Sequence, residues 1–235
     1  MTQSPSLQTT LQDRVEAGQR LVEPLLKYAQ RPDVIVLALP RGGVPVAYQV
    51  VKALDVRLDL MLVRKLGVPS NPEFAMGAIA SGGIQIRNED AMRAHPISPA
   101  AFEAVVARET QELQRRERLY RGARPPLQLK GQVVILIDDG LATGASMMAA
   151  IRAVRLQAPA RIVVAVPVAP LETVEMLSFE VDEVICPLMP EWMMSIGYWY
   201  LSFPQTSDEE VIDLLHRAWQ REAASDTSSR EPFDD

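Results

Sequence analysis

Short runs of apolar residues alternate along the chain with longer segments that repeat apolar residues at helical spacing. The apolar runs cover residues 33–39, 58–63, 133–137, 161–168 and 181–188. The helical segments cover residues 44–54, 144–157 and 171–179. Continuously apolar strands are typical of a parallel sheet that is buried on both faces. The pattern therefore predicts an α/β fold, a parallel sheet covered by helices on both faces with right-handed crossovers.

One interval between the second and third predicted strands breaks this alternation. Residues 75–87 have the pattern of two short strands around a glycine-rich turn, which predicts a hairpin. A long helix is predicted next, with Ser98 as its N-cap and Pro99 at its first helical position, and it ends at about Gly122. We therefore expect an insertion at about 75–122 within one domain.

Polar segments bound this domain at both ends. A C-terminal helix is predicted to begin at Ser207, with Glu210 completing a capping box. Residues 1–9 and 222–235 are polar, and we expect both segments to be disordered. The expected folded domain covers residues 10–221, a length that suits one domain.

Composition narrows the class of protein. Of the 235 residues, 48% are hydrophobic and 23% are charged, as in ordinary soluble folded proteins. The longest apolar runs are far shorter than the ~20 residues that cross a bilayer, and the N-terminus has no signal-peptide pattern. We expect a cytoplasmic protein without membrane contact. The net charge of −6 disfavours nucleic acid as the main partner. One cysteine and two histidines give no cysteine or histidine metal site.

A candidate ligand site lies where the predicted strand 133–137 ends in two adjacent acids, Asp138 and Asp139. Ligands of open α/β sheets bind beyond the carboxyl ends of the strands. The residues that follow the acids are mostly small, and they are Gly140, Leu141, Ala142, Thr143, Gly144, Ala145 and Ser146. Such a turn lets backbone N–H groups approach a phosphate at a helix N-terminus, and its hydroxyls are additional donors.

The two acids must face another part of the ligand, because a phosphate and two carboxylates repel each other. A sugar diol suits them, since carboxylates accept hydrogen bonds and hydroxyls donate them. A ribose 5-phosphate fits both requirements. The alternative is that Asp138 only caps the following helix, which leaves Asp139 unexplained. The sequence has neither the Gly-Lys-Ser/Thr end of a Walker loop nor a dinucleotide-binding G-x-G-x-x-G turn at this position.

Four segments resemble the type I phosphoribosyltransferases, and most closely a bacterial group of predicted phosphoribosyltransferases. The segments are LALPRGGVPVA, VRKLGVPSNPEFAMGAIASGG, VVILIDDGLATGASM and FPQTSDEEV. The likeness covers about Leu11 to Arg217. It implies that the two acids hold the ribose 2- and 3-hydroxyls, that Thr143 to Ser146 bind the 5-phosphate, and that a small hood lies at about 189–206.

The resemblance matches the loop after the first predicted strand to the family's pyrophosphate loop. Its residues are Pro40, Arg41, Gly42 and Gly43. Glycines let backbone N–H groups turn toward a diphosphate, and we expect a non-proline cis peptide at Arg41–Gly42 or beside it. A plain strand-to-helix turn would explain the glycines but not Arg41.

Two cations, Arg64 and Lys65, follow the second predicted strand and are expected at the same sheet edge. They suit a departing pyrophosphate, whose negative charge grows as the glycosidic bond breaks. The alternative is that they flank the strand in solvent. We assign catalytic roles to Asp138, Asp139, Arg41 and Lys65, and ligand binding to Arg64 and the two loops.

Three further segments leave alternatives open. The hairpin at 75–87 is either structural or the mobile lid that the family places there. The aromatic segment 191–203 either packs in the core or stacks on the acceptor. The arginine-rich segment 115–124 is interpreted as a solvated helix face rather than a phosphate or RNA surface.

The resemblance implies a magnesium-dependent transfer of the 5-phosphoribosyl group from phosphoribosyl pyrophosphate to a small nitrogenous base, with release of pyrophosphate. Mg²⁺ would be bound mainly through phosphoribosyl pyrophosphate, and a homodimer is possible. Two other functions stay open. One is a non-catalytic regulator that binds phosphoribosyl pyrophosphate or a nucleotide; the other is a ribose-phosphate phosphohydrolase.

Overall fold

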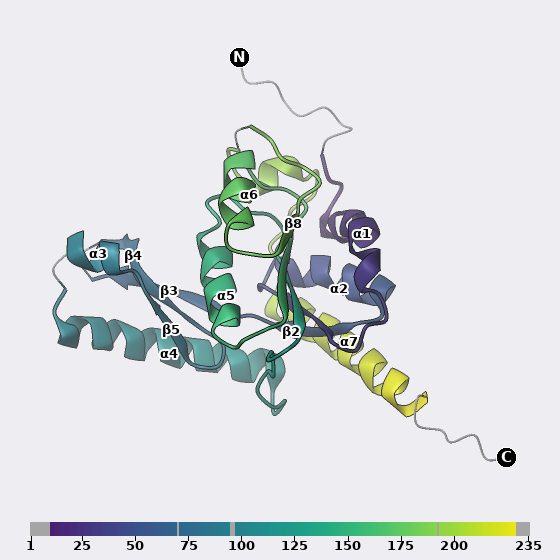
Figure 1. Ribbon diagram of the computed structural model, residues 1–235, viewed down its shortest axis with the longest axis horizontal. Helices are drawn as coiled ribbons and strands as arrows, with labels where there is room; N and C mark the ends of the chain where they lie inside the picture. Colours follow the sequence, from purple (N-terminus) through teal and green to yellow (C-terminus); the bar gives the residue numbers. More distant parts are fainter. Residues whose placement is uncertain (1–9, 70, 95–96, 192, 229–235) are drawn as a thin grey trace.

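The structure is a computed structural model that describes residues 10–69, 71–94, 97–191 and 193–228. A five-stranded sheet lies at its centre, with the strand order β2-β1-β6-β7-β8 (Figure 1). These strands are β1 (Val34–Ala38), β2 (Arg57–Leu60), β6 (Val133–Ile137), β7 (Arg161–Ala165) and β8 (Glu183–Ile185). Every pairing in this sheet is parallel, so the predicted parallel sheet is confirmed.

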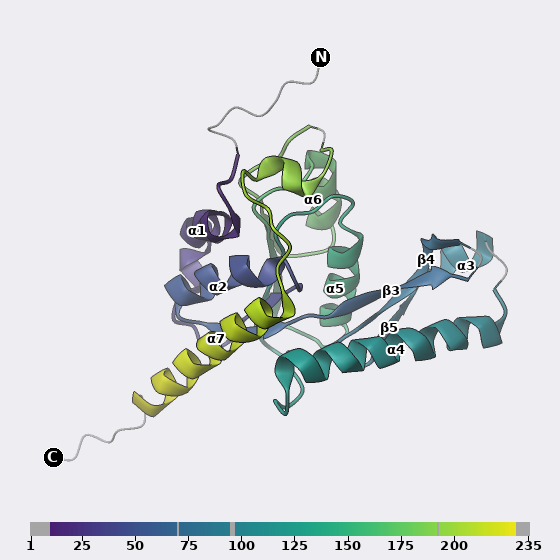
Figure 2. The same ribbon diagram turned by 180° about the vertical axis from the view of Figure 1, so that it is seen from behind.

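Helices cover both faces of the central sheet (Figure 2). One face packs against α1 (Arg14–Leu25), α2 (Gly43–Leu54) and α7 (Asp208–Ser228). The other face packs against α5 (Ala145–Arg155) and α6 (Leu171–Ser178). Successive strand residues point to opposite faces, so Val134 and Ile135 of β6 belong to different apolar clusters. Both faces are buried, which explains why the central strands β1 and β6 are apolar throughout.

The predicted insertion at about 75–122 belongs to a longer arm, residues 63–121, that projects from the central sheet (Figures 1 and 2). Its antiparallel sheet consists of β3 (Val63–Val68), β4 (Asn71–Ala80) and β5 (Ile84–Arg87), and its helices are α3 (Glu89–Ala94) and α4 (Pro99–Arg121). The predicted hairpin corresponds to β4 and β5. The predicted long helix is α4, whose N-cap Ser98 accepts a hydrogen bond from the Ala101 N–H at 3.2 Å.

The predicted end of the second strand, at residue 63, is wrong. β2 ends at Leu60, and β3 begins the arm at Val63. Arg64 and Lys65 therefore lie in the arm rather than at the edge of the central sheet. Met61 and Leu62 between the two strands are buried. The apolar run thus continues through the break, so the sequence gives no sign that the chain changes sheets there.

The arm is tied to the central sheet at the end of α4. Arg121 Nε donates to Asp59 Oδ1 of β2 at 2.9 Å, and the two side chains are only 10% and 6% exposed. One residue earlier, the Tyr120 hydroxyl donates to Asp208 Oδ1 of α7 at 2.5 Å. These contacts fix the carboxyl-terminal half of α4 beside the carboxyl edge of the sheet.

The C-terminal helix begins as predicted, because the Ser207 hydroxyl accepts a hydrogen bond from the Glu210 N–H at 3.1 Å. The predicted disordered tail from residue 222 is wrong as far as Ser228, where α7 ends. An ion pair between Arg124 and Glu222 at 3.1 Å stabilises this extension. The predicted disorder of 1–9 and of the rest of the tail lies outside the described residues. Within the described ranges, every helix is too short or too polar to cross a membrane.

Candidate active site

Two loops meet at the carboxyl edge of the central sheet, one after β1 and one after β6. The strands are paired in register, with Ala38 opposite Ile137, so the two loops start side by side. A Cβ atom on Gly42 would lie 1.9 Å from Asp139 Oδ2, and one on Gly43 would lie 2.7 Å from the Ile137 carbonyl oxygen. Glycine is therefore required at both positions for the loops to pack together.

The loop after β1 has the backbone that the family resemblance predicts. The peptide bond between Pro40 and Arg41 is cis, directly beside the Arg41–Gly42 bond. The Arg41 guanidinium lies 3.6 Å from Asp208 Oδ1 at the start of α7. The loop of Pro40, Arg41, Gly42 and Gly43 is thus in contact with both the acid pair and α7.

The loop after β6 leads into the N-terminus of α5. Gly144 is the N-cap and has a φ of 69°, a left-handed conformation that suits glycine. Leu141 is buried, and its N–H donates to the Val168 carbonyl at 2.9 Å. Its side chain therefore anchors the loop and does not meet a ligand. Exposed residues follow on the solvent side of the loop, namely Ala142, Thr143, Ala145 and Ser146. This helix end is open to an anion.

The two acids have different surroundings. Asp138 is half-buried and accepts a hydrogen bond from the Asp139 N–H at 2.8 Å. Asp139 is only 8% exposed, and Arg14 Nε donates to its Oδ2 at 2.9 Å. Burial raises the pKa of Asp138 well above its ordinary value, and the charge of Asp139 raises it further. Burial also raises the pKa of Asp139, against the opposing effect of Arg14.

Arg14 and the hood around Asp139 are absent from the set of predicted site residues. The Tyr200 hydroxyl donates to the Asp139 carbonyl at 2.6 Å, and the Phe203 ring lies 3.9 Å from the Arg14 guanidinium carbon. Tyr200 and Trp199 pack against the apolar core, which supports the core interpretation of this aromatic segment. Arg14 stands 125 residues from Asp139, so no local pattern could have linked them.

A hollow of about 100 Å³ lies beside Asp138, between the carboxyl edge and the arm. Pro40, Arg64, Asp138 and Ser146 line it, together with Arg116 of α4. Arg64 Nη2 lies 2.6 Å from Glu109 Oε2, and Arg116 Nε lies 2.8 Å from Glu112 Oε1. The site therefore presents arginines that are already paired with acids of the arm.

Lys65 is absent from the lining of the hollow that Arg64 shares with Asp138. It lines a second hollow of about 220 Å³ between the arm sheet and α5, where Ser146 and Arg152 are also found. Neighbouring residues of a strand point to opposite faces. The prediction that Arg64 and Lys65 lie together at one sheet edge is therefore wrong.

The interpretation of 115–124 as a solvated face is wrong for Arg116, which lines the hollow beside Asp138, and for Arg121, which is buried in its pair with Asp59. The spacing of residues along the helix could have indicated that Arg116 is not on the solvated face. Arg116 lies in one row of α4 with three buried residues, Glu109, Leu113 and Tyr120. Successive members of this row are three or four residues apart, which is the spacing of one helix face. The face that carries Arg116 therefore turns toward the core.

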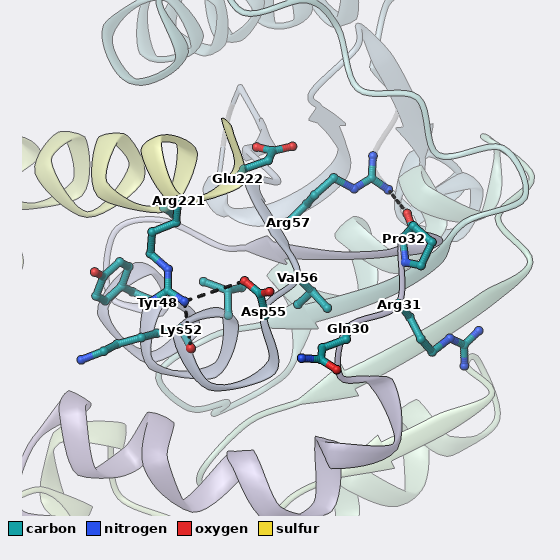
Figure 3. Close-up of a pocket in the computed structure, with 12 residues that line it drawn as sticks. Gln30, Arg31, Pro32, Tyr48, Lys52, Asp55, Val56, Arg57, Arg221 and Glu222 are labelled. Carbon is teal, nitrogen blue, oxygen red and sulfur yellow. Dashed lines mark hydrogen bonds and ion pairs between the residues drawn. The ribbon is translucent and has the colours of Figure 1, made fainter. Parts of the chain in front are cut away.

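A further hollow, of about 540 Å³, lies at the opposite edge of the sheet, near the start of β1 and β2 (Figure 3). Its three arginines, Arg31, Arg57 and Arg221, bind protein groups. Arg221 lies 3.8 Å from Asp55 Oδ1, and Arg57 donates to the Pro32 carbonyl at 3.2 Å. Because this is the amino end of the strands, we do not assign the ligand site here.

The side chains at the carboxyl edge decide whether the protein itself could form a binding site for the expected magnesium ion. The part of the chain that the structure describes has no group of three or more His, Cys, Asp or Glu that could hold a metal. Mg²⁺ prefers oxygen ligands and keeps several from water and substrate phosphates. The residues that the structure describes therefore form no protein cage of acids, cysteines or histidines for such an ion.

Comparison with known proteins agrees with this geometry. A family model described as a phosphoribosyl transferase domain matches residues 8–198. Two curated proteins of Mycobacterium tuberculosis, Rv0571c of strain H37Rv and MT0597 of strain CDC 1551, are 40% identical over 226 residues, which is 95% of this chain. The chain spans about half of their length, 51%.

A solved structure is also similar. The crystal structure of TT1426 from Thermus thermophilus is 41% identical, with a TM-score of 0.78, and the match covers 88% of this chain and 98% of that one. Identity at this level together with this score shows that the two proteins share their fold over most of the chain.

Proposed function

Because the chain belongs to the phosphoribosyl transferase domain family, we propose that it transfers the 5-phosphoribosyl group of phosphoribosyl pyrophosphate to a nitrogenous base and releases pyrophosphate. One observation carries the proposal. An open helix N-terminus, a pair of acids and a glycine loop beside an arginine-lined hollow lie next to one another along the carboxyl edge of the sheet.

Each part of this edge suits one part of the substrate. The N-terminus of α5 at Thr143 to Ser146 suits the 5-phosphate, because its N–H groups and helix dipole favour an anion. The carboxylates suit the ribose hydroxyls. The loop Pro40–Gly43, with Arg41, Arg64 and Arg116 near it, suits the diphosphate.

The reaction breaks the bond between C1 of ribose and the diphosphate oxygen, and the bonding electrons leave with pyrophosphate. The acceptor nitrogen then forms the new bond to C1 from the opposite side and loses its proton to solvent. Positive charge develops on the sugar as the bond breaks, so the carboxylates stabilise the ring and the arginines stabilise the leaving group. Mg²⁺ bound to the diphosphate would neutralise part of its charge.

Pyrophosphate release tests this function. The protein is incubated with phosphoribosyl pyrophosphate and Mg²⁺ against a panel of purine and pyrimidine bases, and pyrophosphate and orthophosphate are measured separately. We expect pyrophosphate release that depends on one class of base and is lost in Asp138→Asn. Orthophosphate release without a base would instead support the phosphohydrolase. Tight binding without release for any base would support the regulator.

A further inference from the structure

The Asp139 carboxylate is held by several contacts inside the protein. Two nitrogens of Arg14 contact the same oxygen, with Nε 2.9 Å and Nη2 2.8 Å from Asp139 Oδ2. That oxygen also faces Gly42, where even a methyl group would not fit. Both side chains of the pair are 11% exposed. The Asp139 carboxylate is therefore directed into the protein, between α1 and the loop after β1.

Arg14 is in turn fixed by the hood. Its third nitrogen, Nη1, donates to the Pro204 carbonyl at 2.6 Å, and the Phe203 ring covers its guanidinium. The chain just before α1 runs beside the hood, because the Leu11 N–H donates to the Trp199 carbonyl and the Leu201 N–H donates to the Leu11 carbonyl, both at 2.8 Å. Each of the three guanidinium nitrogens thus has a protein acceptor before a ligand arrives.

Asp138 has the opposite placement. It lines the hollow beside the carboxyl edge together with Arg64 and Arg116 of the arm. The adjacent acids would repel each other and a phosphorylated ligand if both were free and charged. Arg14 offsets the charge of one of them on the side away from the hollow. The Asp139 carboxylate therefore has a partner before any substrate arrives, whereas the Asp138 carboxylate faces the place where substrate would bind.

We propose that Arg14 is a positioning residue for phosphoribosyl transfer: it locks Asp139 against Gly42 and so fixes the pyrophosphate loop, leaving Asp138 as the carboxylate that binds the ribose diol. This division of labour rests on the proposed function. If the two acids had equal roles, both carboxylates would instead contact the ribose. It also links α1 and the hood to the reacting sugar through a single side chain.

A double-mutant cycle between Arg14 and Asp139 tests the inference, with KM for phosphoribosyl pyrophosphate, KM for the acceptor and kcat as readouts. Arg14→Gln is expected to raise KM for phosphoribosyl pyrophosphate about 10-fold or more, as expected for a displaced binding loop. Arg14→Lys, which keeps the charge, should recover part of the loss. Because Arg14 acts through Asp139, Arg14→Gln should add little when Asp139→Asn is already present.

The matched control is Arg20→Gln on the same helix, whose guanidinium contacts Glu16 and the Thr10 carbonyl and whose ion pair with Glu16 is about one-third exposed. It should leave all three parameters at their wild-type values. Circular dichroism and thermal unfolding establish that each variant is folded at the assay temperature. If Arg14→Gln is not folded, Arg14→Lys takes its place in the kinetic comparison.

Two results would overturn the inference. One is a folded Arg14 variant with wild-type kinetics. The other is a full additional loss from Arg14→Gln in the Asp139→Asn background, which would mean that Arg14 meets the ligand directly. The proposed function fails in a separate way, when the wild-type protein itself neither binds nor turns over phosphoribosyl pyrophosphate in calorimetry and in the release assay.

Discussion

At the scale of single residues, Asp138 and Asp139 show how neighbours in sequence acquire different properties. The loop after β6 was predictable, because two acids and a run of small residues at a strand end indicate a phosphorylated sugar. The different surroundings of the two carboxylates were not predictable. It arises from Arg14 and Tyr200, which lie far away in the sequence and reach Asp139 only in the folded chain.

Asp138→Asn should stabilise the protein at neutral pH. The pKa of Asp138 is raised in the folded state, so ionisation costs folding free energy. That cost is absent below about pH 4, where the unfolded aspartate is also protonated, and it grows as pH rises toward the folded-state pKa. Each unit of pKa shift corresponds to about 1.4 kcal/mol. Urea unfolding at pH 4 and pH 7.5 measures this, and equal gains at both values would contradict it.

The same substitution at the next residue should stabilise the protein less. Burial raises the pKa of Asp139 as well, but Arg14 opposes this rise. Asp139→Asn also leaves the Arg14 guanidinium, which is 11% exposed, without a counter-charge. The free energy of unfolding at pH 7.5 should therefore rise less in Asp139→Asn than in Asp138→Asn. Similar values for the two variants would show that the acids share one environment.

At the scale of elements, the alternation of strands and helices was predictable, and so were the hairpin and the caps of α4 and α7. The change of sheet between Leu60 and Val63 was not, because the linking residues are as apolar as the strands. As a result Arg64 and Lys65 were expected in the wrong sheet. The arm nevertheless brings Arg64 to the site, together with Arg116 from a helix whose charged residues mostly face solvent.

Arg116→Ala should reduce kcat/KM for phosphoribosyl pyrophosphate about 10²-fold, as losses of electrostatic groups at reacting centres do. Arg115→Ala is its control. Both arginines pair with Glu112 and lower its pKa, to about 2, but only Arg116 lines the hollow beside Asp138. Initial rates at varied substrate concentrations compare the two variants. Equal losses would mean that the effect comes from Glu112 or from the helix.

Arg121→Ala should weaken the junction between the arm and the central sheet. The buried pair with Asp59 joins α4 to β2, and its loss should lower the free energy of unfolding by about 3 kcal/mol. Arg217→Ala removes an exposed pair with Asp213 on α7 and a contact with the Tyr48 ring, and it should cost only about 1 kcal/mol. Chemical denaturation of both variants gives the comparison, and a small effect of Arg121→Ala would mean that other contacts hold the arm.

At the scale of the whole molecule, the central sheet brings the ends of β1 and β6 together, while the arm and the hood approach them from two sides. The sequence was enough to predict the sheet and the loops at its edge, since these follow from strand polarity and local residue types. It could not predict the arrangement of the arm and α1, which depends on contacts between residues far apart in the chain, such as Arg121 with Asp59 and Arg14 with Asp139.

The most direct measurement is a phosphorus NMR time course of the protein with phosphoribosyl pyrophosphate, Mg²⁺ and the base that gives the fastest release. The account predicts one pyrophosphate and one nucleoside 5-monophosphate of inverted C1 configuration for each substrate consumed, and no reaction with Asp138→Asn. Formation of orthophosphate without a new nucleotide, or unchanged phosphoribosyl pyrophosphate with every base, would contradict it.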